Sequence, residues 1–347
     1  MKYNSTFLAL SPNGRKKWGY AVTGRSFNPV VAPDGTIYLT SHDFYNARET
    51  NLHALTSAGS LKWKKPLTYL PMALTLRPDG SLILYAKPIG PGGLIDSVIA
   101  LDSTGNQLWK WDTSSPIHDR PAFGYDGTIY VSLGADPQYR PGSVAGLQAL
   151  TPEGASKWFV ETTDEMRPCG PSVGADGTVY FGTTYLGENY STPPLGSLWA
   201  VSSVGTVNWK HELPGHARYH PAIASDGTVI IGSAKSSPFP GTQNCLCAVN
   251  PDGTRRWNYG LGTLNSPATT PAIDVDGNVY VCFSANGDSW LDVLSSAGNF
   301  KWTGSLGGGV VSYAHTVDIG EDGTIYVSAD YVDKLGPVLY AFGPGTP

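Results

Sequence analysis

An Asp-Gly pair that returns every 45 to 50 residues is the feature that most constrains the fold of this chain. The seven copies begin at Asp34, Asp79, Asp126, Asp176, Asp226, Asp276 and Asp322, and each precedes a run of β-branched and aromatic residues. A second recurring position holds tryptophan, at Trp18, Trp63, Trp109, Trp158, Trp209, Trp257 and Trp302. A fixed period of this length indicates a chain of repeated supersecondary units.

Each unit has the pattern of four short strands. In the first complete unit an apolar segment precedes Asp34-Gly35, residues 36–39 follow it, residues 52–55 form a third strand, and Trp63 belongs to a fourth. An Asp-Gly pair between two apolar runs is typical of a hairpin, because both residues tolerate the positive φ of a tight primed turn. A four-stranded antiparallel sheet cannot bury both of its faces alone, whereas radial stacking of such sheets does so.

The sequence therefore predicts an all-β fold, a seven-bladed β-propeller of four-stranded antiparallel blades. Length alone favours about two domains, but the repeat covers the chain and predicts a single domain over residues 1–347. The third-strand motif occurs eight times, since residues 7–10 and 339–342 are both copies, while the closing tryptophan occurs seven times. We expect the strand around Trp18 to complete the last blade and close the ring; which third-strand copy is surplus stays open.

Two segments carry a family resemblance: ALDSTGNQLW at residues 100–109 and AVNPDGTRRW at residues 248–257. They resemble the PQQ-like propeller repeat, A-x-D-x-x-G-x-x-x-W, with Asn250 in place of the aspartate in the second. This family includes quinoprotein alcohol dehydrogenases and the outer-membrane assembly lipoprotein BamB. The resemblance implies that each tryptophan packs against the next blade and donates its indole N–H to a carbonyl. It implies no cofactor here, because quinoprotein dehydrogenases typically have eight blades and an adjacent cysteine pair.

Composition excludes several classes of partner. There are 23 Lys and Arg against 28 Asp and Glu, too small an imbalance to indicate nucleic acid or an anionic membrane. No uncharged apolar run approaches the ~18 residues of a membrane span. The N-terminus lacks the apolar core of a signal peptide, but richness in Ser, Thr, Asn and Gly weakly favours an extracytoplasmic protein. We expect a monomer.

The four cysteines, Cys169, Cys245, Cys247 and Cys282, are too few and too scattered for a disulfide framework or a zinc knuckle. Cys245 and Cys247 share one face of a predicted strand and are therefore expected to be poorly placed to bridge each other. We expect all four to be small buried residues.

The loops opposite the Asp-Gly turns differ in length and composition, as expected of a binding surface on a rigid scaffold, although unconstrained loops also diverge. Aromatic residues recur in these loops, and three of them are candidate binding residues: Tyr139, Tyr190 and Trp290. Such side chains stack on sugar rings or anchor a protein partner. The alternative is that they fold back onto their own blades.

A second group of polar residues precedes the first strand of several blades, where the chain is expected to enter a central channel. Its candidates for ligand binding are His118, Arg120, Arg167, Arg218, His220 and His315. The arginines favour an anionic or polar ligand held by charge-assisted hydrogen bonds, unless they only pair with acidic neighbours in the channel lining. Three converging histidines would hold a metal only with close approach and further partners, and Asp274 to Asn278 has too few ligands for a calcium loop. We therefore predict no metal.

No nucleophile elbow, zinc-protease motif or phosphate-binding loop occurs in a suitable context. The sequence favours a non-catalytic scaffold that binds a glycan, another ligand or a protein at the channel mouth and adjoining loops. The alternative is a carbohydrate-active lyase or hydrolase that uses the histidines and arginines of the channel mouth as base and charge neutraliser.

Overall fold

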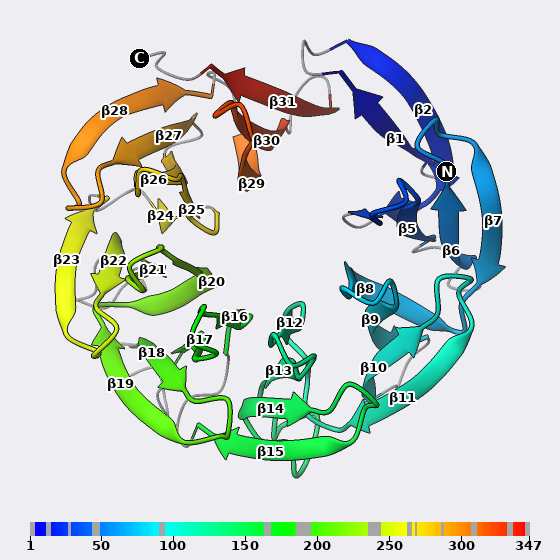
Figure 1. Ribbon diagram of the computed structural model, residues 1–347, viewed down its shortest axis with the longest axis horizontal. Coiled ribbons are helices and arrows are strands. Elements are labelled where there is room, and N and C mark those ends of the chain that lie inside the picture. The colour runs from blue at the N-terminus through cyan, green and yellow to red at the C-terminus, as the bar shows by residue number, and fades with distance from the viewer. Residues whose placement is uncertain are drawn as a thin grey trace. The chain divides into compact units, whose positions relative to one another are not determined.

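The protein is a seven-bladed β-propeller built from antiparallel sheets (Figure 1). The computed structural model describes residues 4–11, 15–26, 29–43, 49–89, 94–162, 168–184, 196–234, 244–261, 266–267, 269–285, 288–306, 311–331 and 336–343. Among these residues every regular element is a strand. Accordingly, this part of the chain contains no helix long and apolar enough to cross a membrane. The all-β propeller predicted from the repeat is confirmed.

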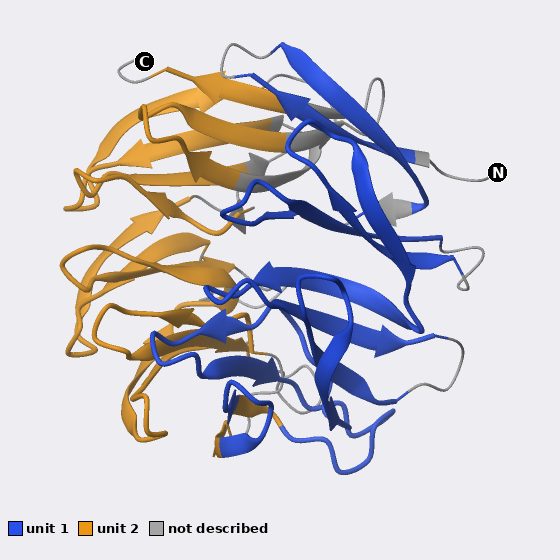
Figure 2. Ribbon diagram, turned by 45° about the vertical axis from the view of Figure 1, so that its right-hand side comes forward, with its two compact units in different colours: residues 1–144, 148–157 blue, residues 145–147, 158–347 orange. Residues whose placement is uncertain are grey.

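The chain divides into two compact units (Figure 2). Unit 1 comprises residues 1–144 and 148–157, and unit 2 comprises residues 145–147 and 158–347. The single domain over residues 1–347 stays a prediction.

The first part of the chain forms an N-terminal hairpin and three sheets, numbered here as blades 1 to 3. The hairpin joins β1 (Asn4–Leu10) to β2 (Lys16–Thr23). Blade 1 consists of β3 (Arg25–Ser26), β4 (Val30–Val31), β5 (Ile37–His42), β6 (Thr50–Leu55) and β7 (Leu61–Pro66). Blade 2 consists of β8 (Tyr69–Leu76), β9 (Leu82–Pro88), β10 (Asp96–Leu101) and β11 (Gln107–Thr113). Blade 3 consists of β12 (Ala122–Phe123), β13 (Ile129–Leu133), β14 (Gly146–Leu150) and β15 (Ser156–Glu161).

Four further sheets, blades 4 to 7, follow in the same strand order. Blade 4 consists of β16 (Ser172–Val173), β17 (Val179–Thr184), β18 (Gly196–Val201) and β19 (Val207–Leu213). Blade 5 consists of β20 (His216–Ile223), β21 (Val229–Ala234), β22 (Cys245–Val249) and β23 (Arg255–Gly260). Blade 6 consists of β24 (Ser266–Pro267), β25 (Ala272–Ile273), β26 (Val279–Ala285), β27 (Asp288–Leu294) and β28 (Phe300–Ser305). Blade 7 contains β29 (Val311–Ile319), β30 (Ile325–Tyr331) and β31 (Gly336–Phe342).

The hydrophobic cores lie between successive sheets of the same unit. One core joins Tyr38 and Leu52 of blade 1 to Leu84 and Ile99 of blade 2, and all four side chains are buried. A second core joins Leu198 of blade 4 to buried residues of blade 5. The middle strands are covered on both faces, as in β10 and β18, whereas the outermost strands alternate exposed and half-buried residues. Each sheet is therefore stabilised chiefly by its neighbours.

The Asp-Gly turns differ in type from the expected tight primed turn. The Gly35 N–H donates to the Ala32 carbonyl at 2.8 Å, and the Ala32 N–H donates to the Thr36 carbonyl at 2.8 Å. Gly35 has a φ of 79°, while the aspartate does not enter the positive-φ region. This is a three-residue hairpin loop, a type I turn closed by a left-handed glycine. Asp34 accepts hydrogen bonds from the Thr36 N–H and hydroxyl at 2.8 Å each, so its carboxylate fixes the turn.

The tryptophans dock as the family resemblance implies. Within the two units, five indole N–H groups donate to a carbonyl in the next sheet at 2.8 to 3.1 Å: Trp18 to Ser57, Trp109 to Pro152, Trp158 to Ser203, Trp209 to Pro251 and Trp257 to Ser296. The accepting carbonyls belong to the turn between the third and fourth strands. These bonds combine with the buried indole surface to set the spacing of successive blades.

The two terminal copies of the third-strand motif both lie in strands. The copy at residues 7–10 lies in β1 and pairs with β2, whereas the copy at residues 339–342 lies in β31 and pairs with β30. Within the described residues, each copy thus pairs with a neighbouring strand of its own unit. Completion of blade 7 by the strand around Trp18 stays a prediction.

The innermost strands share an interruption that shapes the candidate site. In blades 1, 3, 4, 5 and 6 a proline directly precedes the last pair of residues in this strand, at Pro29, Pro121, Pro171, Pro221 and Pro271. Proline cannot donate to the ladder, so the strand bulges there before it resumes. In blades 3, 4 and 5 the residues just before the proline are described, and they are consequently released from sheet pairing.

Candidate functional site

The nine candidate residues fall into two groups, one in each unit. His118, Arg120 and Tyr139 belong to unit 1, and the other six belong to unit 2. Arg167 and Tyr190 lie outside the described residues, and Arg218 and His315 are described only by their backbone, on β20 and β29. Convergence of the two groups at one channel mouth stays a prediction.

In unit 1 two loops of blade 3 are bound to each other, the connector at residues 114–120 and the long loop at residues 134–144. The Gly134 N–H donates to the Pro116 carbonyl at 2.8 Å, and the Val144 N–H donates to the Ser115 hydroxyl oxygen at 2.9 Å. His118 and Arg120 are exposed on the connector, and Tyr139 is exposed on the long loop. We call these two loops together the blade-3 rim surface.

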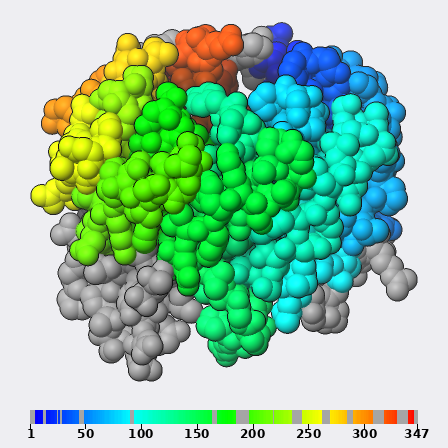
Figure 3. All heavy atoms as spheres, turned by 60° about the horizontal axis from the view of Figure 1, so that its bottom comes forward, coloured from blue at the N-terminus to red at the C-terminus, as the bar shows by residue number. Residues whose placement is uncertain are grey.

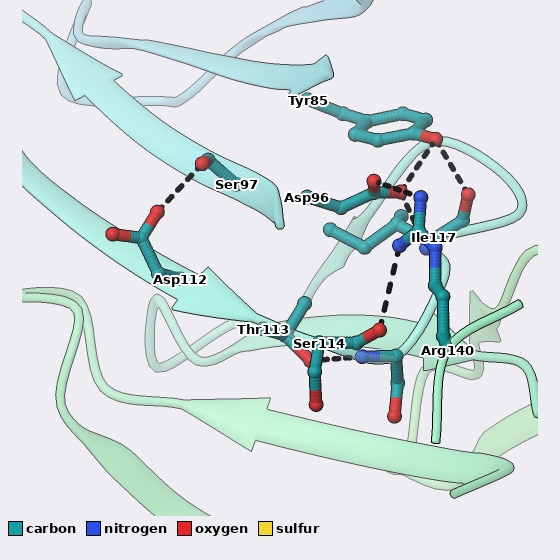
Figure 4. A network of polar contacts seen from close by, with 9 residues as sticks. Tyr85, Asp96, Ser97, Asp112, Thr113, Ser114, Ile117 and Arg140 are labelled. Atoms are coloured by element: carbon teal, nitrogen blue, oxygen red, sulfur yellow. Dashed lines mark hydrogen bonds and ion pairs between the residues drawn. The ribbon is translucent and has the colours of Figure 1, made fainter. Parts of the chain in front are cut away.

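A buried ion pair anchors the long loop to blade 2 (Figure 4). The Arg140 Nη2 atom lies 2.9 Å from the Asp96 carboxylate, and the two side chains are 12% and 0% exposed. Asp96 also accepts the Ile117 N–H at 2.9 Å. The Tyr85 hydroxyl donates to the Ile117 carbonyl at 2.6 Å, and burial together with the nearby Asp96 raises the pKa of Tyr85. One buried carboxylate therefore holds both loops of the blade-3 rim surface.

The long loop is also braced internally. The N–H groups of Tyr139 and Arg140 both donate to the Asp136 carbonyl, at 3.2 and 2.7 Å, and the Asp136 N–H donates to the Ser143 hydroxyl oxygen at 2.8 Å. Tyr139 is nevertheless 67% exposed. In the space-filling view this segment, coloured green, projects at the lower edge (Figure 3). The loop thus presents an aromatic side chain from a backbone that is fixed before any partner binds.

In unit 2 the candidate residues Arg218 and His220 lie at a wide bulge of β20. Arg218 pairs with Gly232 and Ala222 pairs with Ile230, so residues 219–221 face Ile231 alone. Tyr219 has a φ of 61°, the one positive value among the non-glycine residues that the structure describes. A left-handed tyrosine costs roughly 1–2 kcal/mol and persists only where its surroundings enforce it.

The imidazole of His220 packs against the neighbouring innermost strand. Its Nδ1 atom lies 3.3 Å from the Pro171 carbonyl oxygen, and its backbone N–H donates to the Thr270 hydroxyl oxygen at 3.3 Å. A Cβ at Gly170 would lie 2.0 Å from the His220 ring, so only glycine leaves room for the imidazole. The bulge of β20 is therefore held by residues from the sheets on either side.

Neighbouring residues of blade 6 hold both Trp290 and the acidic turn at residues 274–278. The Trp290 ring stacks on Phe283 of the paired strand, with ring centres 5.6 Å apart. Asp274 accepts the N–H groups of Asp276 and Asn278 at 3.0 and 2.8 Å and the Tyr280 hydroxyl at 2.9 Å. Within the described part of the chain, no cluster of three or more His, Cys, Asp or Glu side chains is arranged to hold a metal ion.

The sequence reasoning missed Asp96, Arg140 and Tyr85, the residues that fix the blade-3 rim surface. Nothing in the repeat marks them, because Asp96 occupies an ordinary third-strand position. A signal for the bulges was present, however. Pro121, Pro171, Pro221 and Pro271 recur every 50 residues, directly after several of the candidate positions.

Comparison with known structures shows the same fold at low sequence identity. The Dos1 propeller is 13% identical, with a TM-score of 0.65 over 98% of this chain and 83% of that chain. A streptogramin B lyase is 14% identical, with a TM-score of 0.59 over 98% of both chains. The propeller domain of the Trilobed protease from Pyrococcus furiosus is 12% identical, with a TM-score of 0.58 over 91% of this chain and 94% of that chain.

Comparison of the sequence with curated proteins finds no significant match. Comparison with family models gives a match over residues 95–342 to the family described as outer membrane protein assembly factor BamB, a PQQ-type repeat. The match covers most of the chain, including blades 3 to 6. The chain therefore belongs to the BamB-type family of PQQ-like β-propellers.

Proposed function

We propose that this protein is a non-catalytic scaffold that binds another protein through the blade-3 rim surface. The observation that carries the proposal is the contrast between two adjacent residues of one loop. Arg140 is buried in an ion pair with Asp96, while Tyr139 is 67% exposed. The loop is thus anchored in the fold and still offers a large side chain to a partner.

Such a loop reduces the cost of association. Ordering a flexible loop on binding costs about 0.5–1.5 kcal/mol for each immobilised side chain, and a loop that is already fixed avoids most of this cost. Tyrosine is enriched among the residues that dominate protein interfaces, because it combines a large apolar surface with a hydroxyl group. The exposed Arg120 on the adjoining connector adds a charged group, and arginine is also enriched at such interfaces.

The family supports a protein partner over a glycan. Its name is that of an outer membrane protein assembly factor, and assembly requires binding of other proteins. Glycan binding is the competing possibility, since an exposed tyrosine also stacks on sugar rings. The two possibilities predict different products, a protein adduct or a glycan adduct, when a crosslinking group is placed at position 139.

A photoreactive phenylalanine analogue in place of Tyr139, in cells that naturally make this protein, tests the proposal. Tyr125 is the matched control, because it is 82% exposed in the Asp-Gly turn of the same blade. We expect one discrete protein adduct from position 139 and none from position 125. The identified partner, once purified, should bind the Tyr139→Ala protein at least ~10-fold more weakly. The same adducts at both positions, or an adduct at position 139 that glycosidases remove, would contradict a protein-binding surface.

The alternative of a lyase or hydrolase has one observation in its favour, the bulge of β20. Strained backbone often marks a catalytic or ligand-binding site, and here the left-handed Tyr219 lies between Arg218 and His220. A panel of acidic and neutral polysaccharides tests this alternative by release of reducing ends or unsaturated products. Turnover that His220→Ala abolishes, while the protein remains folded, would replace the scaffold proposal with the enzyme. Lack of turnover on every polysaccharide would leave the bulge as a structural feature.

A further inference from the structure

The thiols of Cys245 and Cys247 lie much closer together than the sequence led us to expect. Both side chains are 1% exposed, and their sulfur atoms are 3.0 Å apart. Non-bonded carbon atoms, by comparison, pack at about 3.5–4.0 Å. The two cysteines share one face of the strand as expected, and their sulfur atoms are in contact there. Both are free thiols in this structure.

The surroundings hold this pair in place. Cys245 pairs with Ser233 and Cys247 with Ile231 across β21 and β22, in the middle of blade 5. The two sulfur atoms belong to the core between blades 4 and 5, beside Leu198 and Leu213. Side chains in a close-packed core have few alternative rotamers. The thiols therefore remain in contact in the folded protein rather than meeting by chance.

The two thiols are chemically unequal. The hydrogen bond from Cys247 lowers the pKa of Cys245, whereas the same bond and burial raise the pKa of Cys247. The thiolate is the nucleophile in thiol oxidation. Of the two thiols, Cys245 therefore becomes the thiolate more readily, and the thiolate is the form that attacks an oxidant.

We propose that Cys245 and Cys247 are a reversible oxidation site that closes to a disulfide within one strand. With hydrogen peroxide as oxidant, the Cys245 sulfur attacks one peroxide oxygen, the O–O bond breaks and hydroxide leaves. The Cys247 sulfur then attacks the resulting sulfenic acid, the S–S bond forms, the S–O bond breaks and water leaves. In total two thiols lose two hydrogens and one peroxide becomes two waters.

The geometry predicts that the bond is easily reduced. Residues two apart in a strand have Cα atoms about 6.6 Å apart, near the upper end of the ~4.4–6.8 Å range that disulfides span. Closing the bond at the usual separation of ~5.5–6 Å would shorten this part of β22. Strained disulfides have more oxidising potentials and are the labile ones.

Peptide mapping tests the proposal directly. Tryptic cleavage after Lys235 and Arg255 releases both cysteines in one peptide, while Cys169 and Cys282 fall in others. After peroxide treatment, quenching and alkylation under denaturing conditions, we expect this peptide to lose two hydrogens and bind no alkylating reagent. Dithiothreitol should restore both alkylation sites.

Two variants serve as controls. In Cys247→Ser the peptide should instead carry a sulfenic acid at Cys245 that dimedone traps. Cys282→Ser should leave the disulfide unchanged, since Cys282 is 0% exposed in the core shared with blade 7. Because burial of the thiols slows their reaction with hydrogen peroxide, a second experiment refolds the protein in the presence of oxidised glutathione. The proposal would be overturned if both cysteines of this peptide were still alkylated after both treatments. A disulfide from Cys169 to either of them, in place of the Cys245–Cys247 bond, would also overturn it.

Discussion

Two buried aspartates show how the surroundings of one residue type decide its role. Asp96 accepts hydrogen bonds from the Arg140 guanidinium and the Ile117 N–H, so its negative charge is compensated inside the protein. Asp292, which is 5% exposed, accepts the Tyr259 hydroxyl at 3.0 Å, and no ion pair to it occurs in the described part of the chain. Burial raises the pKa of Asp292.

Replacement by asparagine should therefore cost far more stability at Asp96 than at Asp292. Asp96→Asn leaves Arg140 buried without its charged partner and should lower the free energy of unfolding by about 3 kcal/mol. Asp292→Asn removes a carboxylate that burial disfavours, so it should cost less than ~1 kcal/mol at neutral pH. A raised carboxyl pKa contributes stability that is lost as pH rises through the folded pKa, so the cost of Asp292→Asn should shrink from pH 4 to pH 7. Denaturant unfolding at both pH values measures this, and equal losses in the two variants would contradict it.

His53 predicts a second pH dependence, of the opposite sign. Its Nδ1 and Nε2 atoms lie 3.0 and 2.9 Å from the hydroxyl oxygens of Tyr20 and Ser41, and the side chain is 3% exposed. Burial, with a smaller contribution from Lys64, lowers the pKa of His53 from 6.5 to about 4. The neutral ring is thus the folded form, and its contribution to stability is present above pH 6.5 and lost as pH falls toward 4.

The free energy of unfolding should fall between pH 7 and pH 4 by about 3 kcal/mol more in the natural protein than in His53→Gln. Glutamine keeps polar atoms near both hydroxyl groups but does not titrate in this range. His118→Gln, at an exposed position, is the control and should keep the natural pH profile. Parallel profiles for the natural protein and His53→Gln would show that His53 is not the group responsible.

Among the strands and turns, the docking of six described tryptophans depends on a glycine in the receiving turn. Gly154 has a φ of 85°, and a Cβ there would lie 2.5 Å from the Trp109 ring. Gly80 has nearly the same φ, 81°, but a Cβ there would meet nothing within 4 Å. Alanine substitutions at Gly154 and Gly80 therefore separate two contributions to the loss of stability. One is the strain of the left-handed backbone, and the other is the steric block of the tryptophan docking site.

Both Gly→Ala variants should lose about 1–2 kcal/mol from the left-handed backbone. Gly154→Ala should lose roughly 1–3 kcal/mol more, because the added methyl group displaces the indole ring from a packed interface. Chemical denaturation of the two variants measures the difference. Equal losses would mean that the indole moves aside at no cost and that its hydrogen bond to Pro152 contributes little.

The elements were predictable from the sequence, but part of the site was not. The repeat predicted the strands, because each depends on residues within one unit, and the family resemblance implied that the indole N–H groups meet carbonyls. The turn type was missed, because Asp34 and Gly35 were taken to share the positive φ that only the glycine adopts. Asp96 and Arg140 were missed because they are 44 residues apart and meet only when two blades pack.

At the scale of the whole molecule, completion of blade 7 remains a prediction that deletion can test. Blade 7 contains three described strands, while β2 carries Trp18, the first of the closing tryptophans. If residues around Trp18 complete this blade, a chain lacking residues 1–23 should lose protection of the β29–β31 amides against hydrogen exchange. Protection of the β17–β18 amides in blade 4 is the internal control. Unchanged exchange in β29–β31 would show that blade 7 does not depend on the N-terminal strand.

The tryptophan contacts also bear on how such a chain arose and how it can be altered. Blades 3 to 6 have their Asp-Gly turns 50 residues apart, and each donates an indole forward and receives one from behind wherever these contacts are described. A duplicated 50-residue segment therefore contains both parts of the contact between blades, the tryptophan indole and the turn whose carbonyl accepts its N–H. Duplication within the gene can lengthen the array without any new complementary surface having to evolve, so blade number is open to change while each such contact keeps its geometry.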